Sequence, residues 1–117
     1  MADSEKQELK LIRDLADQDM LHQLIRQLNK DLKLSGLDHE FKTETLPRQL
    51  IKSLQEFIFS LMTKDFGNYL NFLYRVDVSE AKIKSIPETD AQRISERMCI
   101  LILQREWQKV WFRNKIQ

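Results

Sequence analysis

The chain has 117 residues and a net charge of +1, and hydrophobic and charged residues make up 42% and 32% of it. A chain of this length folds as one domain, and this composition is too apolar for a disordered chain and too charged for a membrane protein. With 2 Gly and 2 Pro, it has too few turn residues for a sandwich or barrel of many short strands.

The periodicity of apolar residues predicts an all-α fold, a single compact bundle of four to five helices with a short N-terminal helical arm. Residues 1–117 then form one helical domain. The arm is predicted at residues 1–17, and the helices at residues 20–34, 46–65, 67–77, 79–86 and 90–115.

The arm carries a short apolar stripe of Leu9, Ile12 and Leu15. The stripe stops at "DQD", residues 17–19, which offers capping residues for the next helix. A stripe this short does not hold a helix by itself. We therefore expect the arm to pack on a second copy of the chain.

The connection at residues 35–45 is polar and is the longest loop predicted. Gly36 is placed to end the preceding helix in the left-handed conformation. Thr45 is the predicted cap of the next helix, and Pro47 lies in its first turn.

The stretch "KDFGNYLNFLYRVD", residues 64–77, mixes apolar and polar letters. Its apolar face is rotated by about 100° from that of the preceding helix, so a break is predicted near Gly67. Phe72 has no obvious place on that face, for which we predict a set of five residues: Phe66, Tyr69, Leu70, Leu73 and Val76.

The polar residues of the same stretch form a second stripe of Lys64, Asn68, Asn71 and Arg75. An amphipathic helix produces this alternation, so we expect a solvated face. An enzymatic site around Asn68, Asn71 and Arg75 is the alternative, and it requires a concave pocket drawn from several helices.

The last predicted helix is apolar on most of its sides, which is typical of a central helix. Cys99 lies among apolar residues, so its thiol is expected to be buried, protonated and inert. The spacings of Arg93 with Glu96 and of Glu106 with Lys109 favour surface ion pairs.

The segment 103–117 gives two interpretations. Arg105, Lys109 and Arg113 recur every four residues, which is typical of a basic amphipathic helix that binds phosphates, anionic membranes or acidic partners. Trp107 and Trp111 lie away from that stripe and favour core packing or a dimer interface. The sequence therefore leaves both interface residues and anion-binding residues as candidates here.

No catalytic residue, cofactor site or metal site is predicted. His22 and His39 stand apart in the sequence, and the "DHE" at 38–40 points its side chains in different directions, so a flexible polar loop is the simpler interpretation. Cys99 has no histidine nearby that could serve as its base.

These patterns predict a small soluble, non-enzymatic protein that acts by protein–protein interaction and associates with itself as a homo-oligomer. The single cysteine and the absence of a long apolar run favour the cytoplasm and no membrane span. A nucleic-acid-associated protein is the alternative function, and an enzyme is the third.

Overall fold

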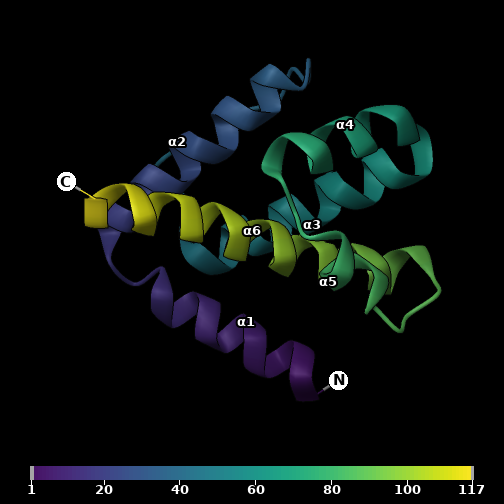
Figure 1. Cartoon of the computed structure of the whole chain (residues 1–117), viewed down its shortest axis with the longest axis horizontal. Coiled ribbons are helices and arrows are strands. Elements are labelled where there is room, and N and C mark those ends of the chain that lie inside the picture. Colours follow the sequence, from purple (N-terminus) through teal and green to yellow (C-terminus); the bar gives the residue numbers. More distant parts are fainter. Residues whose placement is uncertain (1, 117) are drawn as a thin grey trace.

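The computed structural model describes the backbone of residues 2–116 and the side chains of residues 5–116. Met1, the first residue of the predicted arm, lies outside the described residues. The described range forms one compact all-α bundle (Figure 1), as predicted. Its helices are α1 (Ala2–Asp14), α2 (Gln18–Leu34), α3 (Pro47–Lys64), α4 (Phe66–Val76), α5 (Glu80–Lys84) and α6 (Ala91–Ile116).

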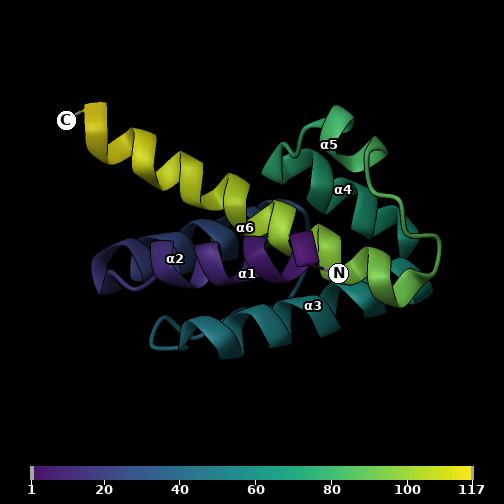
Figure 2. The ribbon, with the colours of Figure 1, turned by 90° about the horizontal axis from the view of Figure 1, so that it is seen from below.

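The predicted central helix is α6, which contacts α1, α2, α3 and α4. Figure 2 shows α1, α2 and α3 below it, and α4 and α5 above its N-terminal half. The side chains of Met98, Ile102, Leu103 and Val110 are fully buried. Since α6 is the element that most others pack against, its side chains decide how the bundle is assembled.

The helix ends follow local side-chain chemistry. Asp17 caps α2, since its carboxylate accepts hydrogen bonds from the amides of Asp19 and Met20. Gly36 follows the end of α2 with a φ of 81°, the left-handed conformation predicted for it. The cap predicted at Thr45 is wrong by one residue, because Leu46 is the N-cap and Pro47 begins α3.

The break between α3 and α4 falls at Asp65 and not at Gly67. Asp65 alone leaves the helical conformation, with φ −152° and ψ 65°, while Gly67 is already inside α4. At the other end of α4, Asp77 takes the left-handed conformation. Ser79 and Asp90 then accept hydrogen bonds from Lys82 and Arg93 in the first turns of α5 and α6.

The predicted buried face of α4 is confirmed at Tyr69, Leu73 and Val76 and is wrong at Phe66 and Leu70. Phe72 is completely buried, whereas Phe66 and Leu70 are 56% and 48% exposed. The residues that α4 buries are Tyr69, Phe72, Leu73 and Val76. They form a compact arc that includes Phe72, so the buried face is shifted toward Phe72 from the predicted one, and Phe66 and Leu70 are left at the surface.

The N-terminal arm is a helix docked on its own chain. α1 packs against α6, and Leu11 and Leu15 are buried at 2% and 1% exposure. The predicted stripe placed Leu9 on the packed side, but Leu9 is 51% exposed. The packing face is therefore centred on Leu11 and Leu15, with Ile12 partly buried at its edge.

Within residues 2–116, no helix combines the length and the apolar character that a membrane crossing requires.

Candidate functional site at the C-terminal end of α6

A buried cluster of charged side chains joins α2 to α6. Asp31 and Glu106 are 3% and 0% exposed. The ammonium of Lys109 lies 2.9 Å from Oδ2 of Asp31 and 2.9 Å from Oε1 of Glu106. The amide of Gln27 donates to Oδ1 of Asp31 at 3.2 Å. We call these four residues the carboxyl–lysine cluster.

The cluster holds two acidic groups beside one basic group in the interior. The pKa of Glu106 is raised to about 9, chiefly because the carboxyl is buried; the hydrogen bond and charge of Asp31 add to the rise, and Lys109 opposes it. Glu106 is therefore protonated at neutral pH. Protonation removes the negative charge that Glu106 would otherwise bury beside Asp31.

The prediction of a surface ion pair between Glu106 and Lys109 is wrong, because Glu106 is completely buried. A stripe along α6 passes through Cys99, Leu103, Glu106 and Val110 at spacings of four, three and four, and all four side chains are buried. The signal was present in the sequence, because Glu106 shares the heptad-like spacing of its apolar neighbours. Its spacing to Lys109 favoured a surface ion pair, so the burial of Glu106 was not predicted.

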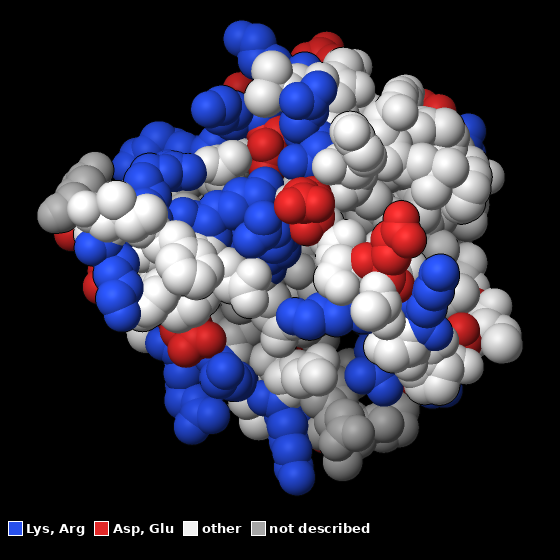
Figure 3. Space-filling view, in the orientation of Figure 1, with Lys and Arg blue, Asp and Glu red and all other residues white. Residues whose placement is uncertain are grey.

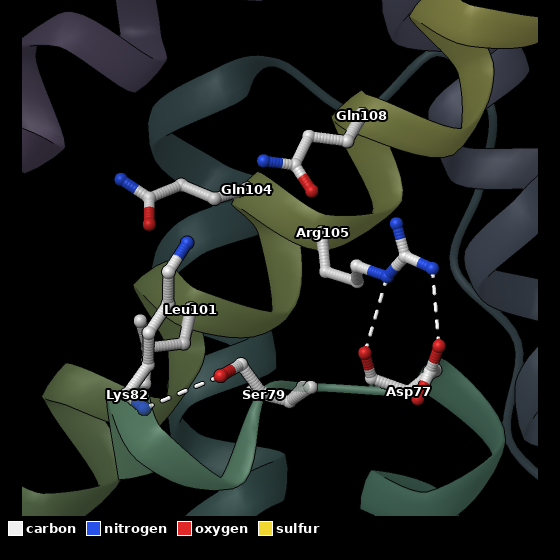
Figure 4. Close-up of a pocket in the computed structure, with 8 residues that line it drawn as sticks. Asp77, Ser79, Lys82, Leu101, Gln104, Arg105 and Gln108 are labelled. Atoms are coloured by element: carbon white, nitrogen blue, oxygen red, sulfur yellow. Dashed lines mark hydrogen bonds and ion pairs between the residues drawn. The ribbon is translucent and has the colours of Figure 1, made fainter.

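The three basic residues predicted to bind anions lie in different surroundings. Lys109 belongs to the carboxyl–lysine cluster. Arg113 donates a hydrogen bond to the amide oxygen of Gln27, so it lies next to that cluster. Arg105 points the other way and donates to the backbone oxygen and the Oδ2 of Asp77, both at 3.1 Å (Figure 4).

A cavity of about 350 Å³ lies beside Arg105, between the start of α5 and α6 (Figure 4). Ser79 and Lys82 line it from the α5 side, and Gln104 and Gln108 from α6. Hydroxyl, amide and basic groups suit a small polar molecule, but this set of groups does not single out a chemistry.

The last turns of α6 carry exposed aromatic and aliphatic side chains. All residues from 111 to 116 are exposed, with Trp111, Phe112 and Ile116 at 37%, 53% and 83%. We call these three residues the aromatic end. Trp111 stacks on Trp107, with ring centroids 6.2 Å apart, and meets Phe112 edge-on at 5.2 Å. The interface predicted from the sequence included Trp111 but not Phe112 or Ile116.

Trp107 lies one turn earlier, at the junction of α6 with α1. It is partly buried against the core and lines a small cavity with Lys10 and Asp14 of α1. Its Nε1 is buried and has no hydrogen-bond partner among the described residues. Of the five predicted interface residues, Leu15 is thus used inside the chain, Ile12 and Trp107 are shared with the core, and Leu9 and Trp111 face solvent.

The polar stripe of α4 lies on the surface. Asn71 and Arg75 are exposed, and Asn68 is partly buried and donates to Oδ2 of Asp65 at 2.7 Å. The apolar residues on the outside of this helix are Phe66, Leu70 and Tyr74, which we call the α4 outer face. Figure 3 shows a broad uncharged area over α4.

His39 and Cys99 take structural positions. His39 stacks on Phe57 with ring centroids 4.2 Å apart, and partial burial lowers its pKa. Cys99 is buried, its Sγ lies 3.3 Å from the backbone oxygen of Ile51, and burial raises its pKa. Within the described part of the chain, no three or more His, Cys, Asp or Glu side chains gather as a metal site needs.

Comparison with known proteins gives no match. No protein-family model fits the chain, and no curated protein and no solved structure is significantly similar to it.

Proposed function

We propose that the protein acts by protein–protein contact, without catalysis of its own, and that it self-associates through the aromatic end of α6. The observation that carries the proposal is the exposure of the whole segment 111–116, which includes Trp111, Phe112 and Ile116. Tryptophan and phenylalanine in exposed clusters are typical of protein interfaces.

The aromatic end is held in place on its other side by polar contacts with α2. The amide of Asn114 donates to Oε1 of Gln23 at 3.1 Å, and Arg113 donates to Gln27. The last turns of α6 are therefore fixed before any partner arrives. A surface that is already ordered loses less conformational entropy on binding.

The charges around the aromatic end support a second copy as the partner. Three acidic residues lie around the turn between α1 and α2, namely Asp14 at the end of α1, Asp17 in the turn and Asp19 in the first turn of α2, and the end of α6 carries Arg113 and Lys115. Figure 1 shows this turn and the C-terminal end of α6 on the same side of the molecule. In a two-fold dimer, each acidic turn faces the basic helix end of the other copy, so the surface is self-complementary.

The size of the aromatic end sets the strength that we expect. A standard interface buries about 800 Å² on each partner, and three side chains provide only part of that area. We therefore expect a dimer that dissociates on dilution through roughly micromolar concentrations.

The first test is light scattering behind size exclusion for the natural chain and for Phe112→Ser. Phe66→Ser on α4 is the matched control, because the two phenylalanines are 53% and 56% exposed. We expect Phe112→Ser to shift the mass toward the monomer and Phe66→Ser to leave it unchanged. A monomer for the natural chain at about 100 μM, far above the expected dissociation constant, would contradict self-association.

Nucleic-acid binding receives less support as the alternative function. Arg105 and Lys109 already contact Asp77, Asp31 and Glu106, so a phosphate would have to compete with carboxylates of the chain. An enzymatic site around Asn68, Asn71 and Arg75 also receives less support, because Asn71 and Arg75 lie exposed on α4.

A further inference from the structure

The carboxyl–lysine cluster places an amine and two carboxyl groups in contact. The Nζ of Lys109 lies 2.9 Å from Oδ2 of Asp31 and 2.9 Å from Oε1 of Glu106. Lys109 and Asp31 are 78 positions apart in the chain, so the contact joins α6 to α2. The carbon that an amine attacks is Cγ of Asp31, which is bonded to that Oδ2. The two atoms that would react are therefore held as near neighbours.

The cluster is largely shielded from water. The side chains of Asp31 and Glu106 are 5% and 0% exposed, and that of Lys109 is 18% exposed. Burial removes the hydration that favours an ammonium and a carboxylate, so a neutral amine beside a carboxylic acid costs less here than in water. Lys109 is the member of the cluster that reaches the surface, so a small product can leave on its side.

Glu106 is a third reactive group that the ion pair does not need. One carboxyl group is enough to pair with one ammonium, and Asp31 supplies it at 2.9 Å. A second buried carboxyl adds a cost of desolvation, and burial is the main reason that the pKa of Glu106 is raised. A protonated carboxyl in contact with a reacting nitrogen can donate one proton and accept another, which is the work of a general acid–base catalyst.

We propose that Lys109 and Asp31 join through an amide bond between their side chains, with Glu106 as the catalytic acid–base group. The ammonium proton first passes to Asp31, which leaves a neutral amine and a carboxylic acid. The lone pair of Nζ attacks Cγ, and Glu106 donates a proton to the departing oxygen and accepts one from the nitrogen. The C–O bond breaks, one water leaves, and Glu106 ends as it began, so no other reactant is needed.

The bond forms slowly after folding, because an ammonium has no free lone pair and only the neutral pair reacts. Freshly purified protein is therefore mainly unlinked, and the effect of Glu106 on the free energy of unfolding concerns that unlinked form. The bond closes a loop between positions 31 and 109, which restricts the unfolded chain, so the linked chain should melt at a higher temperature. The reaction is separate from self-association and does not depend on it.

The test is intact-protein mass spectrometry of the natural chain during incubation for several days at neutral pH. We expect a species lighter by about 18 Da, the mass of one water, and its share should grow with time. Trypsin does not cleave after an acylated lysine, so this species should yield a branched peptide that joins residues 31–33 to residues 106–113. Loss of water within the backbone gives no branched peptide.

Variants then assign the role of each group. Glu106→Gln keeps a neutral side chain of the same size, and the share of the linked species should fall at least tenfold. Lys109→Arg removes the amine and should abolish the bond. Asp31→Asn offers an amide in place of the carboxyl, so its linked species should be lighter by about 17 Da, the mass of ammonia. Glu56→Gln, exposed on α3, is the matched control and should react at the natural rate.

Three results would overturn the proposal. They are a natural chain that keeps its full mass throughout, a lighter species that contains no branched peptide or persists in Lys109→Arg, and an unchanged rate in Glu106→Gln. Circular dichroism of each variant checks that it keeps the natural helix content. Phe112→Ser tests self-association and should form the bond at the natural rate, so failure of one proposal is distinguishable from failure of the other.

Discussion

Glu106 is the residue whose chemistry departs furthest from its ordinary behaviour. In the unfolded chain its carboxyl has the usual pKa of 4.5, and in the folded chain burial raises the pKa to about 9. Between these values the folded protein holds a proton that the unfolded chain has lost. The contribution of Glu106 to the free energy of unfolding is therefore complete below about pH 4.5 and declines as the pH rises toward 9.

Glu106→Gln is expected to stabilise the protein at neutral pH by about 1–3 kcal/mol, because glutamine keeps the neutral form without the cost of taking up a proton. The gain should grow with pH and disappear near pH 4. Urea unfolding at pH 4, 6 and 8 measures it, with Glu56→Gln on the exposed side of α3 as the control. An equal gain at all three values would contradict the assignment.

In the carboxyl–lysine cluster, the burial of Glu106 could be predicted from the sequence, but its contact with Asp31 could not. The stripe of Cys99, Leu103, Glu106 and Val110 could have placed Glu106 inside from the sequence. Its partner Asp31 lies on another helix, 75 positions earlier, and only the packing of α2 on α6 brings the two together. A contact between elements has no local spacing to reveal it.

α1 is the element whose role changes most between sequence and structure. A stripe of apolar residues too short for an independent helix indicated a partner, and that partner is α6 of the same chain. The burial of Leu11 and Leu15 replaces the contact expected between copies. A short helix gains its stability from any apolar surface it reaches, so periodicity alone does not say which molecule supplies the surface.

Leu11→Ala is expected to cost about 2–4 kcal/mol of unfolding free energy, because the side chain is 2% exposed and leaves a cavity between α1 and α6. Leu9→Ala, two positions away and 51% exposed, should cost less than about 0.5 kcal/mol. Urea unfolding of both variants gives the comparison. Equal losses would show that α1 does not pack in this orientation.

The apolar pattern of α4 does not decide which of its faces is buried. Two overlapping arcs fit its apolar letters, one through Phe66 and Leu70 and one through Tyr69 and Phe72. The helix buries the second arc, since the break at Asp65 sets its rotation relative to α3. A single non-helical residue determines that rotation, and the sequence does not state its dihedral angles.

The whole molecule was predictable in class and in its central element. Few glycines and prolines, long apolar periodicities and an all-round apolar last helix led to a bundle around α6, and the fold agrees. Its surfaces were less predictable, because exposure depends on which helices cover each face. Trp111 was expected in an interface from the sequence, whereas the α4 outer face became visible only once the rotation of α4 was known.

The central claim is that the aromatic end of α6 is covered by a second copy. The chain has 2 tryptophans, so Trp107→Phe leaves Trp111 as the single indole reporter. Its emission maximum, followed from about 100 μM down to about 0.1 μM, measures the claim directly, because an indole emits at shorter wavelength when an interface removes it from water. We predict a shift to longer wavelength on dilution, together with a fall in mass by light scattering. An emission maximum that stays constant while the mass changes would contradict the claim, since self-association would then use another surface.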